Sequence, residues 1–218
     1  IATIRSRCRH LGLRIPTAAA VADLLVREGV ATPEVALEAA RAAQSHIGLA
    51  RALARDPQMR ERRRAIITAP ASVRSVGEAV MAADRLLETA KAQADAQVSE
   101  RNAREKAELM RQLGMDEGES ATKASRTMIR QLEEDQKRRS KRALTDAIDR
   151  ALIDLLAIYR DVLMVQVGGD GELINTDLSD LVHQIAQDST PRQTLARVDH
   201  IETARKRLVS NGNPLLVL

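Results

Sequence analysis

Apolar residues recur along most of the chain at every third or fourth position, the spacing of one face of an α-helix. The longest such pattern runs from Met128 to Val167. Its C-terminal half has an apolar stripe, and its N-terminal half is mostly charged, with acids four residues before bases. The stripe consists of Leu144, Ile148, Leu152, Leu155, Leu156, Tyr159, Val162 and Leu163, and the charged pairs are Glu133–Lys137, Glu134–Arg138 and Asp135–Arg139. We predict one long helix with one half packed in a bundle and the other half in solvent.

A second helix with two different halves is expected from about Val76 to Leu113. Ser75 and Glu78 have the spacing of a capping box at its start. The first half has an apolar face, whereas the stretch from Gln93 to Lys106 is almost entirely polar. Residues 114–118 contain two glycines and would turn the chain back towards the long helix. Residues 94–142 are therefore predicted to form an antiparallel helical hairpin that projects from the bundle.

The first third of the chain indicates shorter elements. Polar and apolar residues alternate from Arg9 to Ile15, which predicts one short strand. Caps, prolines and glycines then delimit short helices, and proline with small residues suggests a linker at Ala69–Ser72. The short helices are expected at Thr17–Glu28, Pro33–Ser45, Ile47–Arg55 and Pro57–Thr68.

The last third predicts two more helices, Thr176–Gln187 and Pro191–Val209, the second with a capping box at Thr190 and Gln193. A turn at Asn211–Pro214 precedes what looks like the start of a further helix, because proline suits the first helical position. The absence of an initiator Met and this unfinished pattern suggest a piece of a larger protein. The predicted fold is all-α: a small helical domain at 9–70 and a helical bundle at 71–218, truncated at its C-terminus.

Composition limits the classes of function. The chain has no Phe or Trp and one Tyr, so its core must be aliphatic and it lacks the aromatic platforms on which single-stranded nucleic acids stack. No apolar run is long enough for a membrane span, and a single cysteine, Cys8, fits a reducing compartment. Residues 1–70 hold 12 Arg and Lys against 6 Asp and Glu, which makes the N-terminal end the basic one.

No catalytic or metal-binding constellation is apparent. The four histidines, His10, His46, His183 and His200, lack partners at ligand spacing apart from Cys8 beside His10. A P-loop is absent, and no nucleophile has a recognisable base. Taken alone, the chain is therefore expected to bind no metal or cofactor and to catalyse no reaction.

The run Thr3–Arg9 is the exception, because it places Arg7 between Ser6 and Cys8. From composition alone it is a basic, exposed loop. The Ser-Arg-Cys triplet before a short strand and small helices nevertheless resembles the motif that closes the AAA+ core in clamp-loader subunits. The segments at 132–139, 149–152, 159–163 and 213–216 are similar to δ′ subunits of bacterial DNA polymerase III. The resemblance to that family therefore extends over the whole chain.

The resemblance implies a domain plan and roles for individual residues. Residues 1–8 would end the AAA+ core, 9–70 would be its lid domain and 71–218 the collar domain through which subunits form a ring. Arg7 would be an arginine finger, acting in trans on ATP bound by a neighbouring subunit, with Ser6 and Cys8 positioning the loop. Cys8 is expected to pack as a small hydrophobe. Arg51, in Gly48-Leu49-Ala50-Arg51, occupies the position of a nucleotide-sensing arginine in related lid domains. In a subunit that hydrolyses no nucleotide, the favoured interpretation is that Arg51 packs or forms an ion pair at the lid surface.

Two basic clusters remain ambiguous. The arginines at 60–64 and the Lys and Arg residues at 137–142 could contact DNA phosphates. The first cluster is more typical of a helix–helix or subunit contact. The second has acids one turn away and is more typical of a neutralised surface.

The resemblance implies a non-catalytic subunit of the DNA polymerase III holoenzyme, a nucleotidyltransferase, that helps load the sliding clamp onto primed DNA in the cytoplasm. Its partners would be the other clamp-loader subunits, the clamp and primer-template DNA, with ATP bound by the neighbours. Two alternatives stay open: a helical adaptor with no replication role, and an active AAA+ ATPase whose P-loop lies upstream. The role of the 94–142 hairpin is not indicated.

Overall fold

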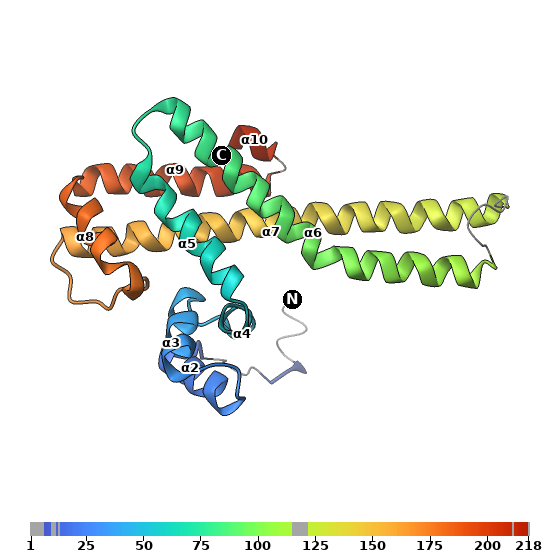
Figure 1. The fold of residues 1–218 in the computed structure, drawn as a ribbon, viewed down its shortest axis with the longest axis horizontal. Helices are drawn as coiled ribbons and strands as arrows, with labels where there is room; N and C mark the ends of the chain where they lie inside the picture. Colours follow the sequence, from blue (N-terminus) through green and yellow to red (C-terminus); the bar gives the residue numbers. More distant parts are fainter. Residues whose placement is uncertain (1–6, 10–11, 13, 115–121, 211, 218) are drawn as a thin grey trace. The chain divides into compact units, whose positions relative to one another are not determined.

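The computed structural model describes residues 7–9, 12, 14–114, 122–210 and 212–217, and within these it is all-α (Figure 1). The all-α prediction is confirmed. None of the described residues belongs to a strand, although one was expected at Arg9–Ile15. His10, Leu11 and Leu13 lie outside the described residues, and Arg9, Gly12, Arg14 and Ile15 have no regular structure. A single alternating segment makes a strand only where a neighbouring strand takes up its backbone hydrogen bonds.

The chain divides into two compact units, Ile1–Glu61 with Leu173–Asp177, and Arg62–Glu172 with Leu178–Leu218. The first unit contains the helices α2 (Ala18–Arg27), α3 (Pro33–Ala42) and α4 (Ile47–Arg55) and the start of α5 (Pro57–Ser72). Its core is rich in alanine, which allows short helices to approach closely. The largest buried residues there are Val21, Leu25 and Leu53.

Local signals determine where these short helices begin and end. The Thr17 hydroxyl accepts a hydrogen bond from the Ala20 amide and caps α2. The side chain of His46 caps α4 in the same way by accepting from the Leu49 amide. Gly29 follows α2 with a φ of 66°, a left-handed conformation that glycine adopts without a steric penalty.

Helix α5 ends later than expected. Ala69–Ser72, the expected linker, forms its last turn, and Pro70 lies inside the helix. A proline near the end of a helix removes only one backbone hydrogen bond, and apolar packing can offset that loss. The packing is visible in the second unit, where Ile67 is completely buried and Ala71 lies against the same cluster. The boundary between the compact units falls at Glu61 and Arg62, within the helix.

The second unit is organised around the long helices α6 (Val76–Gln112) and α7 (Lys123–Gln166), which contact each other. α8 (Ser179–Gln187), preceded by the 3-10 turn η1 (Thr176–Leu178), and α9 (Pro191–Val209) pack on the C-terminal half of α7. A short helix, α10 (Pro214–Val217), contacts both α9 and α6. Both expected capping boxes, Ser75 with Glu78 and Thr190 with Gln193, are present.

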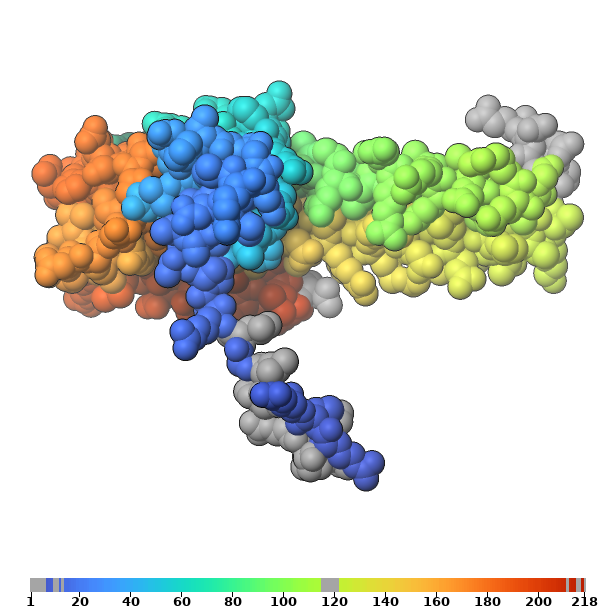
Figure 2. Space-filling view, turned by 90° about the horizontal axis from the view of Figure 1, so that it is seen from below, coloured from blue at the N-terminus to red at the C-terminus, as the bar shows by residue number. Residues whose placement is uncertain are grey.

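The predicted antiparallel hairpin is also present. Beyond the bundle, α6 and α7 continue side by side through residues 94–112 and 123–142, which we call the arm (Figures 1 and 2). Its base has a small apolar core in which Ala94 and Val98 pack against Ala143. Among the described residues, no helix is both long enough and apolar enough to cross a membrane.

Candidate functional site

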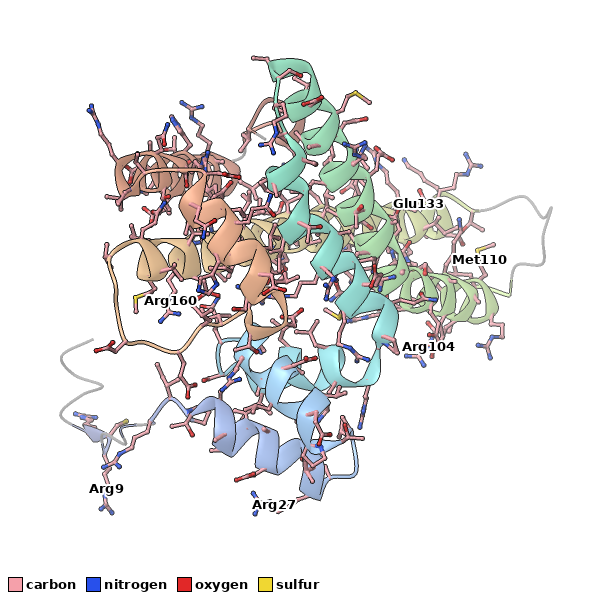
Figure 3. The ribbon with its side chains drawn as sticks, turned by 60° about the vertical axis from the view of Figure 1, so that its left-hand side comes forward. Arg9, Arg27, Arg104, Met110, Glu133 and Arg160 are labelled. Carbon is pink, nitrogen blue, oxygen red and sulfur yellow. The ribbon has the colours of Figure 1, made fainter. Side chains whose placement is uncertain are left out.

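Arg7, the expected arginine finger, is exposed, as are Cys8 and Arg9. Ser6 lies outside the described residues. Cys8 was expected to pack as a small hydrophobe, and that expectation is wrong because the free thiol is exposed. The residue precedes α2 and is absent from the buried cluster of that unit. Figure 3 shows the side chain of Arg9 extending away from the ribbon.

Arg51, the expected nucleotide-sensing residue, forms an ion pair with Glu28. Its Nη2 lies 2.7 Å from one carboxylate oxygen and 2.9 Å from the other, and its Nε donates to the first across 3.0 Å. This two-pronged geometry is the strongest form of the arginine–carboxylate contact. About a third of each side chain remains exposed. The pair joins α4 to the residue that ends α2, and its effect on nucleotide binding stays a prediction.

The arginines at 60–64 are used within the fold. The Nη1 of Arg60 donates to the carbonyl oxygens of Leu53 and Ala54, which are backbone acceptors at the end of α4. In the second unit, the Nε of Arg63 lies 3.0 Å from Oδ1 of Asp154 on α7. This agrees with the expectation of a helix–helix contact for the cluster.

The ion pair of Arg63 and Asp154 is almost fully buried, with side-chain exposures of 11% and 8%. Burial raises the pKa of Asp154 above its ordinary value, although the positive charge of Arg63 acts in the opposite direction. The cost of desolvating the carboxylate therefore exceeds the gain from its partner. Helical spacing offers Asp154 only Arg150 on its own helix as a partner, so the sequence pattern does not indicate its contact with Arg63 on α5.

Two of the basic residues at 137–142, Arg138 and Arg139, have acid partners, although these differ from the expected ones. Arg138 pairs with Asp135, and Arg139 reaches across the arm to Glu105 on α6, at 2.8 Å. The pKa of Glu105 is lowered by its hydrogen bonds from Arg139 and Arg101. The spacing of charges along one helix indicates only partners on that same helix. The contact between α6 and α7 was therefore not predicted.

Glu134 and Glu133 also have partners other than those expected. Glu134 pairs with Arg130, and Glu133 lies 3.7 Å from Lys106 on the opposite helix. Figure 3 labels Glu133 on α7 and Arg104 on α6, which are the two helices of the arm. Ion pairs therefore join the two helices of the arm in its middle part, where Glu105 and Lys106 face Arg139 and Glu133.

The second unit contains an apolar groove of about 780 Å³, which the sequence analysis did not predict. We define it by its lining from α5, α6, α7, α9 and α10: Arg62, Ala65, Ile66, Ala69, Pro70, Val73, Ala79, Ala82, Ala83, Arg85, Leu86, Thr89, Leu152, Leu155, Tyr159, Arg197, His200, Ile201, Thr203, Ala204, Arg207 and Val217. On α6, which contributes Ala79 and Ala83 to the lining, Val76 and Val80 are 83% and 64% exposed. The sequence analysis predicted an apolar face on the first half of this helix, but a sequence pattern does not show whether another element covers such a face.

Two residues that line the groove, Tyr159 and Arg197, form a cation–π contact. The guanidinium of Arg197 lies over the ring of Tyr159, 5.6 Å from its centre. Burial raises the pKa of Tyr159, and the charge of Arg197 opposes that shift. No group of three or more His, Cys, Asp or Glu side chains among the described residues could hold a metal ion.

Comparison with known proteins gives one partial similarity. The chain is 42% identical to the δ′ subunit of DNA polymerase III from Bacillus subtilis (strain 168) over 59 residues. The matched segment is 27% of this chain and 18% of the relative, so the chain matches less than a fifth of that protein. No family model matches the chain, and no solved structure matches it.

Proposed function

We propose that this chain is part of a clamp-loader subunit of the δ′ type, which helps place the sliding clamp on primed DNA without hydrolysing ATP itself. The observation that carries the proposal is the 42% identity over 59 residues to a δ′ subunit. Under this proposal residues 9–70 form a lid domain, and 71–218 form a collar that binds the other subunits of a cytoplasmic complex. The all-helical structure of the described residues is compatible with both assignments.

Arg7 is the residue to which we assign the main chemical role. A guanidinium keeps its charge at any physiological pH and offers a planar fork of donors, which suits the oxygens of a phosphate whose bond is breaking. To act on a neighbouring subunit, such a side chain must be exposed on its own subunit. The exposure of Arg7 meets that requirement, and the two exposed residues after it provide matched positions for control variants.

The proposal predicts that Arg7→Ala in the full-length protein slows ATP hydrolysis by the assembled complex. An arginine finger contributes about 10³–10⁵-fold to the rate at the site it serves. The ATP site that Arg7 serves should therefore lose nearly all of its activity, while the other ATP sites of the complex continue to hydrolyse ATP. Arg7→Lys keeps the positive charge but lacks the planar fork of donors, so it should restore only a small part of the hydrolysis rate. The measurement is the hydrolysis rate stimulated by clamp and primed DNA.

Arg9→Ala is the matched control, because Arg9 is a nearby exposed arginine outside the Ser-Arg-Cys triplet. It should leave the rate unchanged. Each variant is first tested for co-purification with the ATPase subunits, so that a failure of assembly is not mistaken for a loss of chemistry. Normal assembly with an unchanged rate for Arg7→Ala would refute the role of Arg7. Failure of the unmodified protein to bind those subunits would instead favour a helical adaptor with no replication role.

A further inference from the structure

A second, smaller cavity of the same unit adjoins the apolar groove. It has a volume of about 80 Å³, and we call it the polar pocket. The residues that line only this pocket are Ala71, Arg74, Gln184, Ile185, Asp188 and Ser189. The residues that line both cavities are Pro70, Val73, Tyr159 and Arg197. A large apolar cavity and a small polar one therefore meet at the side chains of α5, α7 and α9 and at the segment that joins α5 to α6 (Figure 1).

The walls of the groove suit an apolar chain. They consist mainly of small and aliphatic side chains, such as Ala83, Leu86 and Leu155. An alkyl chain gains free energy when such walls remove it from water. The volume of about 780 Å³ lies within the range of small-molecule sites, which are mostly apolar and use a few polar groups to fix the orientation of the ligand.

The charges around the two cavities favour an anion. The charged residues of the polar pocket are Arg74, Arg197 and Asp188, and two positive charges against one negative charge leave a net charge of +1. In the part of the chain that the structure describes, neither arginine is held in an ion pair. None of the described residues that line the groove is an Asp or Glu. A ligand with one carboxylate would neutralise the pocket, whereas a cationic ligand would be repelled.

Arg197 is the residue best placed to bind the charged end of such a ligand, because it lines both cavities. Its guanidinium lies 5.6 Å from the centre of the Tyr159 ring. The face of a ring attracts the cation without an acceptor oxygen, so the N–H donors of the guanidinium can still bind an anion. Two parallel hydrogen bonds to a carboxylate are the strongest contact that an arginine makes with one.

We propose that the groove and the polar pocket together form a binding site for an amphipathic carboxylate of the fatty-acid class. The alkyl chain lies in the groove, and the carboxylate binds Arg197 where the cavities meet and Arg74 in the polar pocket. Burial of the chain supplies most of the affinity, and the two arginines select the negatively charged end. This inference goes beyond the proposed function and does not depend on it.

The experiment measures the binding of dodecanoate to the chain by isothermal titration calorimetry, at concentrations too low for micelles to form. Decanoate has the same carboxylate and a shorter tail. Because burial of the two missing methylene groups changes an affinity by about tenfold, dodecanoate should bind about tenfold more tightly than decanoate. Dodecyltrimethylammonium has the same tail as dodecanoate and the opposite charge. It should bind more weakly than dodecanoate by about tenfold or more.

Matched variants locate the ligand in the two cavities. Arg74→Gln removes a charged donor from the polar pocket and should weaken the binding of dodecanoate by about tenfold. Arg104→Gln removes the same charge from an exposed position on the arm, outside both linings, and should have no effect (Figure 3). Ala79→Glu places an acid on the α6 wall of the groove and should also weaken binding by about tenfold. Ala92→Glu, outside the lining of the groove, should have no effect.

All four positions are exposed, so none of these changes is expected to disturb folding. Three results would overturn the proposal. The first is equal binding of dodecanoate and dodecyltrimethylammonium. The second is equal affinity of the variants at Arg74 and Arg104, or of those at Ala79 and Ala92.

The third result is displacement of dodecanoate by a designed acidic amphipathic peptide at comparable concentration. The peptide has about 18 residues, a length sufficient for a bound helix. Such displacement would show that the groove receives a helix of another protein rather than an alkyl chain. The binding assay contains no ATPase subunit, clamp or DNA, so its result is independent of the test of Arg7.

Discussion

At the scale of single residues, the buried pair of Arg63 and Asp154 is the most consequential contact in the second unit. It joins α5 to α7 with both side chains almost completely removed from water. Loss of Asp154 removes the carboxylate partner of the buried guanidinium of Arg63. We therefore expect Asp154→Ala to lower the free energy of unfolding by about 3–5 kcal/mol, measured by chemical denaturation.

Replacing both partners with apolar residues should have a very different result. The raised pKa of Asp154 indicates that desolvation outweighs the attraction of Arg63. The combination Arg63→Met with Asp154→Leu removes both buried charges and keeps the volume roughly constant. It should be neutral or more stable than the parent by about 1–4 kcal/mol. A double variant that is as unstable as Asp154→Ala would show that the pair itself, rather than the avoidance of an unpaired charge, stabilises the unit.

At the scale of elements, the arm depends on contacts between α6 and α7. Glu105 receives hydrogen bonds from Arg139 on the opposite helix and from Arg101 on its own. The substitution Glu105→Gln keeps the shape of the side chain but removes its negative charge, and with it both charged contacts to the arginines. The variant should show faster amide hydrogen exchange along the arm than the parent, while exchange in α8 and α9 stays unchanged.

The same contact predicts a dependence on pH. The pKa of Glu105 in the folded arm lies below its ordinary value of 4.5. Its stabilising effect is therefore present above about pH 4.5 and is lost as the pH falls through the lower, folded value. Parent and Glu105→Gln should become alike under those acidic conditions. Glu108→Gln, one turn along the exposed side of α6, is the control, and an equal effect of the two variants would contradict the assignment.

Helices and caps were predictable from the sequence because their causes are local. Thr17, Ser75 and Thr190 each accept a hydrogen bond from a backbone amide three residues later, and the sequence states that spacing directly. For the arm, the sequence predicted a helical hairpin but not the ion pairs between its two helices. Which base pairs with which acid depends on the register of α6 against α7, and neither sequence pattern specifies that register.

The limits of each unit were less predictable for the same reason. Ala69–Ser72 has the composition of a linker, but the burial of Ile67 and the packing of Ala71 keep this turn helical. Val76 and Val80 have the spacing of a packed face but are exposed. A pattern shows which side of a helix is apolar, whereas tertiary structure decides whether another element covers it. The groove could therefore not be predicted, and Arg7 drew attention only through its resemblance to a family motif.

At the scale of the whole molecule, the net charge of +4 suggests an affinity for DNA that the arrangement of charges does not support. Among the described residues, Arg51, Arg63, Arg139 and Arg205 already have carboxylate partners in the fold. The chain also has no Phe or Trp, and its one Tyr, Tyr159, is buried, so bases have no aromatic platform on which to stack. Contact with DNA would depend on exposed cations outside these ion pairs.

We therefore expect the isolated chain to bind primer-template DNA weakly and by charge alone. Its dissociation constant should lie near or above about 10⁻⁶ M at physiological salt, and the affinity should fall steeply between about 50 mM and 200 mM salt. Fluorescence anisotropy with labelled DNA measures both quantities. Changing the DNA sequence should have no effect, because phosphate contacts carry no sequence information. Sub-micromolar binding that persists at high salt would reveal a nucleic-acid surface built on contacts other than charge, and DNA recognition would then belong to this chain rather than to the assembled complex.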